Sequence, residues 1–397
     1  MNQTLQFRKK GILPIQKLRV LHHFGVIRSD KDYPIQEDQF QPNSVDLRLG
    51  KVAYRVRCGF LPENETVTDK IQKLCQHEFS LENGAVLEPN CTYIIPLLEN
   101  LHLPVSNMAE LVTGEKSSRE TIGFSSSSML SAKSNPKSTT GRLDIFTRLV
   151  TDYSHRFEEI SPGYNGPLFL EVVPKSFPVR VRTGQRLNQL RVRHGNGKLN
   201  DDEILRTHSI DTLLFSNDKK PIADDKIVVD GGLFMSVDLT GTKDRVVGYK
   251  AKKNRDLIDL EKVGHYKVSD FWDPIYAGQD DYMILEPEAF YIFASKERCR
   301  IPRHLAGEMV PYDTGSGELR THYAGFFDSG FGGDVTDAGA RAVLEVRSHD
   351  VPFLVEDGQT FFRMIYEANT DIPEFVYGSK LASNYQGQEL KLSKHFK

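Results

Sequence analysis

Hydrophobic and polar residues alternate over short stretches of the chain, and Gly and Pro bound many of these stretches. Such stretches, rich in β-branched and aromatic residues, predict β-strands. The clearest are Val45–Leu49, Tyr93–Leu97, Leu168–Val173, Val179–Arg182, Met283–Phe293 and Ala342–Val346. One amphipathic helix is predicted between Pro14 and Gly25, where the residues on one face are Ile15, Leu18, Leu21 and His22. Strands at short spacing, without alternating helices, predict an all-β sandwich or barrel rather than a doubly wound sheet.

Five short segments recur in the same order in the second half of the chain. The matches are Ser44–Leu47 with Ser236–Leu239, Leu87–Pro89 with Leu285–Pro287, Pro104 and Glu110 with Pro302 and Glu308, Leu170–Val172 with Leu344–Val346, and Gly184–Gln185 with Gly358–Gln359. One tripeptide match is chance, but five in order are not. We therefore interpret the chain as an internal duplication.

A polar stretch separates the two copies and contains the predicted seam. It begins at Gly195–Gly197, and Asn217–Pro221 ends it before an apolar run. The predicted organisation is a first domain over residues 1–200, a linker over 201–225 and a second domain over 226–397. A length of 397 residues also favours two hydrophobic cores over one.

Composition and charge describe an ordinary globular chain and exclude several classes of protein. The net charge is −3, so no global basic field indicates a nucleic-acid partner. No apolar run approaches the roughly 20 residues that span a bilayer, which argues against a membrane protein. The polar N-terminal segment has no apolar core of a secretory signal. The four cysteines are scattered, so we expect no disulfide framework and a reducing, cytoplasmic location.

Six segments carry a resemblance to a known family. They are Gln41–Gly50, Gly114–Ser118, Pro162–Glu171, Gly184–Leu190, Ala324–Phe331 and the stretch from Tyr377 through Gln388. They resemble six segments of the dCTP deaminases, which are relatives of the dUTPases. In the same order, these are the opening strand, the phosphate-contacting Gly-Arg-Ser-Ser segment, the strand with the catalytic glutamate, the turn after that strand, the segment whose aspartate meets deoxyribose, and the mobile tail. The tandem arrangement is similar to a two-domain branch of that family.

The resemblance implies two tandem dUTPase-like domains, each a distorted β-barrel or jelly roll, and deamination of dCTP. It makes Glu345 the principal catalytic candidate and Glu171 the weaker one, because the second copy keeps both Asp328 and the tail. The implied substrate-binding residues are Lys116, Ser117, Ser118, Arg119, His322, Ala324, Asp328, Tyr377, Lys380 and Gln388. Lys, Arg and hydroxyl side chains within four residues of each other suit a triphosphate.

Each copy also departs from the family pattern. The first has Ser161 where the family places its aspartate, and a long apparent insert over Ser125–Arg142. The second has Tyr312–Gly317 where the paired serines are expected. These complementary losses suggest composite sites, in which the Ser-Ser segment of one copy faces the Glu strand of another. Enzymes of the family that the chain resembles are trimers with sites between subunits, so we expect an assembly of three chains with six domains. The alternative is that the second copy takes the place of a neighbouring subunit, in which case a monomer or a twofold dimer suffices.

The chemistry of deamination explains why a glutamate on a strand would be needed. Zinc deaminases need His-x-Glu and a Cys-x-x-Cys pair, and this sequence has neither, which argues against a zinc site. A metal-independent route needs a carboxylate that takes a proton from water and later delivers it, and burial raises a Glu pKa toward that task. We expect Mg²⁺ only as a companion of the substrate triphosphate. A dUTP diphosphatase, a bifunctional deaminase–diphosphatase and a silent nucleotide-binding regulator remain alternatives.

Overall fold

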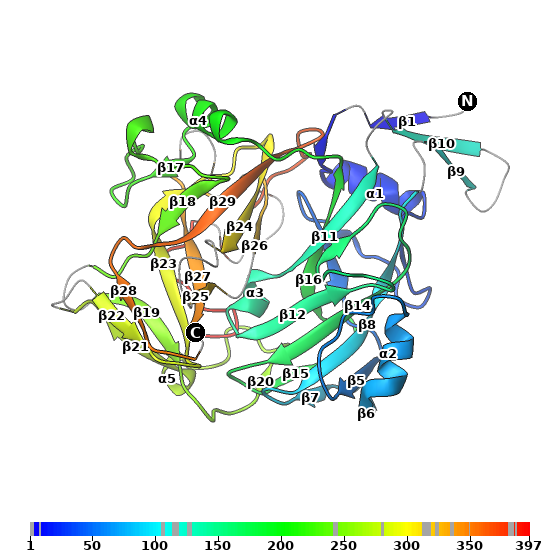
Figure 1. The fold of residues 1–397 in the computed structure, drawn as a ribbon, viewed down its shortest axis with the longest axis horizontal. Coiled ribbons are helices and arrows are strands. Elements are labelled where there is room, and N and C mark those ends of the chain that lie inside the picture. Colours follow the sequence, from blue (N-terminus) through cyan, green and yellow to red (C-terminus); the bar gives the residue numbers. More distant parts are fainter. Residues whose placement is uncertain are drawn as a thin grey trace.

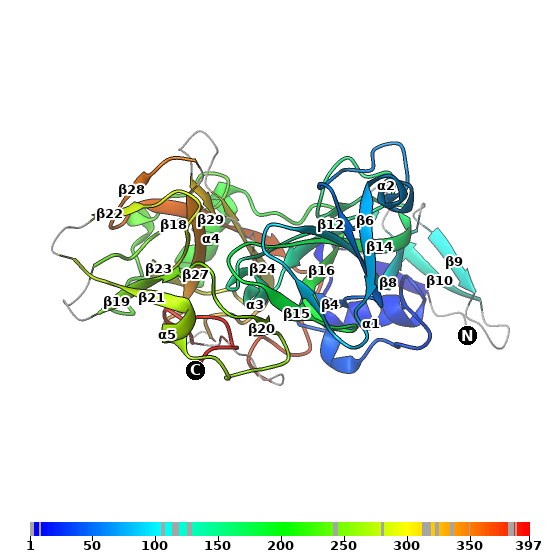
Figure 2. The ribbon, with the colours of Figure 1, turned by 90° about the horizontal axis from the view of Figure 1, so that it is seen from below.

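The computed structural model describes residues 4–7, 9–104, 108–112, 119–124, 129–240, 245–278, 282–311, 319–321, 325–333, 337–348, 350–379, 385 and 387–397. Figure 1 shows two β-rich bodies that correspond to the two halves of the chain, and Figure 2 shows them side by side. The all-β prediction is confirmed, since only short helices accompany the strands. Within the described residues, no helix is long and apolar enough to cross a membrane.

The elements of the first half are mostly strands. The strands are β1 (Thr4–Phe7), β2 (Gly11–Ile12), β3 (Ile27–Ser29), β4 (Val45–Arg48), β5 (Val52–Val56), β6 (Cys75–Ser80), β7 (Ala85–Leu87), β8 (Thr92–His102), β9 (Met108–Val112), β10 (Arg119–Phe124), β11 (Leu130–Pro136), β12 (Ile145–Val150), β13 (Glu159–Ile160), β14 (Asn165–Pro174), β15 (Val179–Val181) and β16 (Arg186–His194). The helices are α1 (Ile15–His23), η1 (Glu37–Gln39), α2 (Val67–Leu74) and α3 (Ser138–Gly141). The helix predicted after Pro14 is confirmed as α1.

The second half repeats this composition. Its strands are β17 (Leu214–Phe215), β18 (Leu233–Ser236), β19 (Val246–Ala251), β20 (Ile258–Asp259), β21 (Trp272–Tyr276), β22 (Tyr282–Leu285), β23 (Phe290–Cys299), β24 (Leu305–Pro311), β25 (Leu319–Thr321), β26 (Gly325–Phe327), β27 (Ala340–Ser348), β28 (Phe353–Glu356) and β29 (Thr360–Ala368). Its helices are α4 (Asp201–Ile210), η2 (Asp224–Lys226) and α5 (Val268–Phe271). The stretch predicted as one strand over Met283–Phe293 is two strands, because Pro287 and the left-handed Glu288 (φ 58°) turn the chain between β22 and β23.

Sheet topology supports the duplication. In the first copy, one sheet runs β12-β14-β8-β5-β6 and another joins β11, β16 and β4. In the second copy, β27-β23-β19-β21 and β24-β29-β18 reproduce these neighbours in the same order. The pairing of β11 with β16 has its counterpart in the pairing of β24 with β29.

This pairing corrects the position of the predicted insert. Because β11 has β24 as its counterpart, Leu130–Pro136 belongs to the common fold, and the insert assigned to Ser125–Arg142 is wrong. The extra chain lies earlier, where the hairpin β9–β10 joins β1 in a separate sheet. The sequence match of Glu110 with Glu308 is likewise wrong, since Glu110 lies in that hairpin and Glu308 in β24.

The segment predicted as a linker is folded onto the second copy. Asn200 caps α4 by accepting a hydrogen bond from the Glu203 backbone N–H, 2.9 Å away. Ile204 of α4 is buried in the second core, together with Leu213 and Leu214. Residues 201–215 therefore begin the second domain rather than separate it from the first.

The two copies pack tightly against each other. Phe177 of the first copy contacts Phe271 and Trp272 of the second, with ring centroids 5.6 Å apart in both pairs. β15 pairs in parallel with β20, so a short sheet crosses between the copies. Apolar burial and backbone pairing at this interface hold α3 between the two bodies, as both ribbon views show.

Candidate active site

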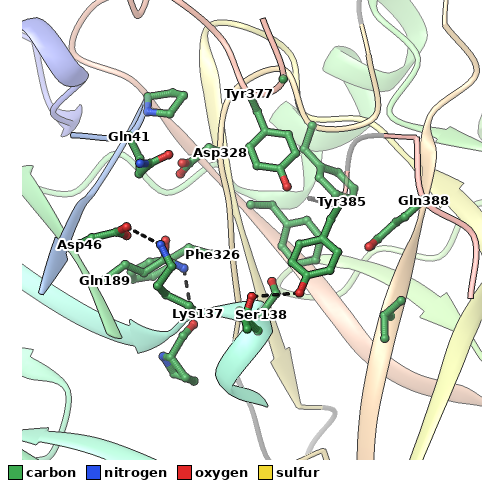
Figure 3. A pocket seen from close by; sticks show the side chains of 18 of the residues that line it. Gln41, Asp46, Lys137, Ser138, Gln189, Phe326, Asp328, Tyr377, Tyr385 and Gln388 are labelled. Carbon is green, nitrogen blue, oxygen red and sulfur yellow. Dashed lines mark hydrogen bonds and ion pairs between the residues drawn. The ribbon is translucent and has the colours of Figure 1, made fainter. Parts of the chain in front are cut away.

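A cavity of about 380 Å³ lies where the two copies meet. The first copy contributes Asp46 of β4, the segment around α3 and Arg186 of β16. The second contributes Asp328, Glu345 and the C-terminal tail. Figure 3 shows Asp46 and Lys137 on one side and Tyr377, Tyr385 and Gln388 of the tail on the other. The cavity is therefore lined by both copies of one chain.

Glu345 lies on β27 at the wall of this cavity and is only 6% exposed. Its neighbours on the strand, Leu344 and Val346, are fully buried in the second core. Burial raises the pKa of the Glu345 carboxyl to about 8, against the opposing effect of Arg142 and with a further rise from Asp144. A carboxyl group with this pKa exchanges protons readily near neutral pH, which suits a general base.

Gly141, the last residue of α3, presses its backbone against the Glu345 carboxylate. A Cβ atom placed on Gly141 would lie 2.2 Å from Oε2 of Glu345, far inside contact distance. The position of α3 is fixed by hydrogen bonds to the Leu187 carbonyl, from the Lys137 N–H at 2.9 Å and the Thr140 hydroxyl at 2.8 Å. Glycine is thus required here so that the first copy can approach β27, the strand of the second copy that carries Glu345.

The end of the cavity formed by the first copy is rich in charged side chains. Lys137 forms an ion pair with Asp46, and Arg186 lies 3.8 Å from Asp46 and 2.8 Å from Asp38. Asp46 is buried, and its Oδ1 has no hydrogen-bond partner among the residues that the structure describes. Burial and the nearby Lys137 and Arg186 lower the pKa of Lys394, against the opposing effect of Asp46.

Asp328 reaches the cavity from the loop after β26 and is held by the first copy. Arg191 of β16 lies 2.9 Å from its carboxylate and also donates hydrogen bonds to the Gly307 and Phe327 carbonyls. The Arg191 guanidinium stacks over the Phe326 ring at 4.1 Å. Burial raises the pKa of Asp328, whereas Arg191 lowers it. The aspartate is therefore fixed in orientation by the neighbouring copy.

Glu171, the equivalent glutamate of the first copy, has a different environment. It is 1% exposed and does not line the cavity. The Arg148 guanidinium lies 2.6 Å from its carboxylate, and the same guanidinium stacks over the Phe157 ring at 3.7 Å. Gly59 covers the other oxygen, since a Cβ there would lie 2.4 Å from Oε2. The Glu171 carboxylate is therefore ion-paired within its own copy and lies away from the cavity.

The structure brings together four of the predicted site residues. Glu345, Asp328, Tyr377 and Gln388 all line the cavity. Arg119 begins β10 in the sheet of β1 and β9, and its side chain lies outside the described part of the structure. Lys116, Ser117, Ser118, His322, Ala324 and Lys380 lie outside the described residues.

Sequence reasoning missed the segment that lines the cavity from the first copy. Lys137, Ser138, Thr139 and Arg142 line it, with the same residue types as the predicted Lys116–Arg119 segment. The signal was present, since a lysine, two hydroxyl residues and an arginine follow one another closely in Lys137–Arg142. It was overlooked because this stretch was interpreted as an insert, and only the pairing of β11 with β16 removes that interpretation.

Fold and cavity together define a tandem β-domain protein with a cavity between its two copies, which is lined by charged side chains and by the buried carboxyl of Glu345. Comparisons with known proteins agree. Residues 200–396 match the family "2'-deoxycytidine 5'-triphosphate deaminase (DCD), C-terminal domain". Residues 9–123 and 119–196 match its N-terminal domain. The chain belongs to the dCTP deaminase family.

Individual relatives support this membership. The crystal structure of 2'-deoxycytidine 5'-triphosphate deaminase from Agrobacterium tumefaciens is 42% identical, with a TM-score of 0.79, over 92% of this chain and 100% of that chain. "dCTP deaminase, dUMP-forming" of Corynebacterium jeikeium is 35% identical over 28% of this chain and 56% of the relative. The protein of the same name from Mycolicibacterium vanbaalenii is 34% identical over 26% of this chain and 54% of that relative. The chain thus spans about half the length of the curated relatives it matches.

Proposed function

We propose that this chain hydrolyses dCTP to dUTP and ammonia, with Glu345 as general base. Glu345 takes a proton from the water that attacks C4 of cytosine, and then delivers a proton to the departing amine. The observation that carries the proposal is a buried carboxyl at the cavity wall whose pKa is raised to about 8. Glu345 lines the cavity, so a water molecule or the base could reach its carboxyl from there.

The remaining parts of the nucleotide fit the other walls. Lys137, Ser138 and Arg186 offer cations and a hydroxyl to the phosphates, and this supports assigning the triphosphate to the first copy's end of the cavity. Asp328, fixed by Arg191, is suited to accept a hydrogen bond from the deoxyribose 3′-hydroxyl. Tyr377, Lys380 and Gln388 of the tail would cover the nucleotide, and His322 and Ala324 remain candidates for the base pocket.

Mg²⁺ enters this proposal as a companion of the triphosphate. Among the described residues, no three His, Cys, Asp or Glu side chains converge in a way that could hold a metal ion. The buried Oδ1 of Asp46 has no partner and lies beside Lys137, so Asp46 fits as an oxygen donor to such an ion or to its water shell. Bound Mg²⁺ would offset phosphate charge; the proton transfers at cytosine belong to Glu345.

Product analysis tests the proposed function directly. The protein is incubated with dCTP, and separately with dUTP, in the presence of Mg²⁺, and nucleotides, ammonia and pyrophosphate are resolved. Ammonia and dUTP from dCTP support the proposal. The printed names of the two curated relatives favour a second candidate, a bifunctional enzyme, which would give dUMP and pyrophosphate. Pyrophosphate from dUTP without deamination would indicate a diphosphatase, and binding without turnover a silent regulator.

The pH dependence of the rate should report Glu345. A base must be ionised, and the free enzyme holds this carboxyl protonated up to a pKa of about 8. We therefore expect kcat/KM to rise about tenfold per pH unit below that value and to level off above it. Steady-state rates between pH 6 and 9.5 measure the profile. A profile that is flat across this range would contradict the role of Glu345.

For assembly, we propose the homo-trimer expected from the resemblance, in a cytoplasmic enzyme. Each chain already encloses one composite cavity, so further chains would add stability rather than complete this site. A cross-strand pair of exposed apolar residues, Ile284 and Leu354 on the β22–β28 ribbon, offers a surface for chain–chain contact. Sedimentation at micromolar concentration should give about three times the 45.1 kDa chain mass. A monomer at all concentrations would rule out the trimer.

A further inference from the structure

The guanidinium of Arg142, which acts electrostatically on Glu345, is held by the C-terminal tail. Its Nη2 donates to the side-chain oxygen of Gln388 at 2.8 Å, and its Nη1 donates to the Lys391 carbonyl at 2.9 Å. The Tyr385 ring stacks on it at 3.9 Å. Arg142 belongs to the first copy, whereas all three of these contacts belong to the tail of the second. The position of this cation therefore depends on where the tail lies.

Gln388 is in turn fixed to β27, the strand that carries Glu345. Its side-chain N–H₂ donates to the backbone carbonyl of Arg341 at 3.0 Å, and its backbone carbonyl accepts from the backbone N–H of Arg341 at 3.3 Å. One glutamine thus connects β27 of the second copy to Arg142 of the first. Figure 3 shows Gln388 on the tail side of the cavity. Two hydrogen bonds of this kind are weak alone, so the tail needs a further anchor to stay in this register.

The next residue, Glu389, supplies an anchor of opposite charge. Its carboxylate lies 2.5 Å from Nη1 of Arg298 and 3.1 Å from Nε of Arg341. The side chains of Arg298 and Arg341 are only 6% and 4% exposed, and that of Glu389 is 58% exposed. Among the described residues, Glu389 is the one carboxylate within ion-pair distance of Arg298. An exposed carboxylate on the tail thus meets two buried guanidinium groups on the domain body.

We propose that Glu389 is a positioning residue, whose ion pairs with Arg298 and Arg341 lock the tail so that Gln388 holds Arg142 beside Glu345. This inference rests on the proposed function of Glu345, and it deepens that function by naming what keeps the site assembled. Glu389 itself does not line the cavity, to which the described part of the tail contributes Phe375–Gly378, Tyr385 and Gln388.

The test compares Glu389→Gln with a matched control, Glu286→Gln. Glu286 is also exposed and makes an ion pair, with Lys250 at 2.5 Å, but lies outside the cavity lining. For Glu389→Gln we expect kcat/KM for dCTP to fall about tenfold at low salt. The loss should shrink toward 1 M salt, because salt then partly screens the exposed Glu389 carboxylate from its two arginines in the wild type. The control should stay near wild type at both.

The pH profile separates positioning from general destabilisation. Arg142 lowers the pKa of Glu345, so a loosened Arg142 should shift the midpoint of kcat/KM to higher pH. The other titratable groups facing the cavity with Glu345 are Asp38, Asp46, Lys137, Arg186, Asp328, Tyr377 and Tyr385, with Asp144 acting nearby. None of these changes in Glu389→Gln. An unchanged midpoint together with a reduced rate would overturn the proposal.

Two further measurements complete the test. If Glu389 acts through Gln388, the double variant Gln388→Ala/Glu389→Gln should be no slower than Gln388→Ala alone, whereas additive losses would overturn the proposal. Hydrogen exchange of residues 387–397 without nucleotide should be faster in Glu389→Gln than in Glu286→Gln. This last readout needs no turnover. A wild-type protein inactive on dCTP would therefore refute the proposed function, while unchanged exchange would refute the lock.

Discussion

Glu345→Gln is expected to lower kcat for dCTP deamination by about a thousandfold while the Michaelis constant changes less than about threefold. Glutamine keeps the shape of the side chain but cannot accept the proton of the attacking water. The phosphate and sugar contacts, which lie on other elements, remain. Measured steady-state rates should therefore show an effect on turnover and little on binding.

The matched control is Glu171→Gln in the first copy. It removes a carboxyl of equivalent sequence position that is ion-paired with Arg148 and lies outside the cavity lining. The protein should keep most of its turnover, with some loss of stability because Arg148 is left without its partner. If Glu171→Gln is inactive and Glu345→Gln is near wild type, the roles of the two copies are reversed.

Glu345→Gln should lower the rate but raise the stability of the folded protein at alkaline pH. The folded pKa of Glu345, about 8, exceeds its ordinary value of 4.5, so the folded state binds more protons between these values. Stability that this group provides below pH 4.5 is therefore lost as pH rises toward 8. Glutamine removes the penalty. We expect Glu345→Gln to be more stable than wild type by roughly 2–5 kcal/mol at pH 8.5 and by little at pH 5. Denaturant titrations at the two pH values measure the difference.

Gly141→Ala is expected to reduce kcat by about a hundredfold, because misplacing a catalytic group by about an ångström has effects of that size. The new methyl group would meet the Glu345 carboxylate at 2.2 Å, and either α3 or the glutamate must move. α3 is tied to the Leu187 carbonyl by two hydrogen bonds, so the glutamate side chain is expected to yield.

A double variant distinguishes this mechanism from simple loss of fold. Once Glu345 is replaced by glutamine, moving that side chain costs little further activity. Gly141→Ala/Glu345→Gln should therefore be about as slow as Glu345→Gln alone. A much slower double variant, or a large fall in the Tm of Gly141→Ala, would show that the methyl group disrupts the interface rather than the base.

The two copies illustrate how one duplicated strand acquires two roles. Both glutamates sit in a Leu-Glu-Val context and both are buried, since either is 6% exposed or less. The difference lies in what covers them. In the first copy Arg148 and Gly59 of the same domain close over Glu171, and in the second copy α3 of the other domain leaves a cavity beside Glu345. The neighbouring elements, rather than the strand, decide which glutamate can react.

Much of the fold followed from local pattern. Alternating β-branched residues predicted β4, β8, β14 and β27, and the spacing after Pro14 predicted α1, because short-range periodicity reports which face of an element is buried. The recurring tripeptides revealed the duplication. The insert and the linker were misplaced, because neither the pairing of β11 with β16 nor the burial of Ile204 leaves a local signal.

The sequence by itself determined which types of residue are candidates for the site: a strand glutamate in each copy, an aspartate before Ser329 and a polar tail. Only the tertiary structure decided that Lys137–Arg142 faces the cavity, that Arg148 forms an ion pair with Glu171, and that Gln388 of the tail accepts a hydrogen bond from Arg142. The physical reason is that the pKa and accessibility of a carboxyl depend on charges and packing brought from distant segments. Strand periodicity is fixed by adjacent residues, whereas the environment of Glu345 is fixed by a helix that lies some two hundred residues earlier in the chain.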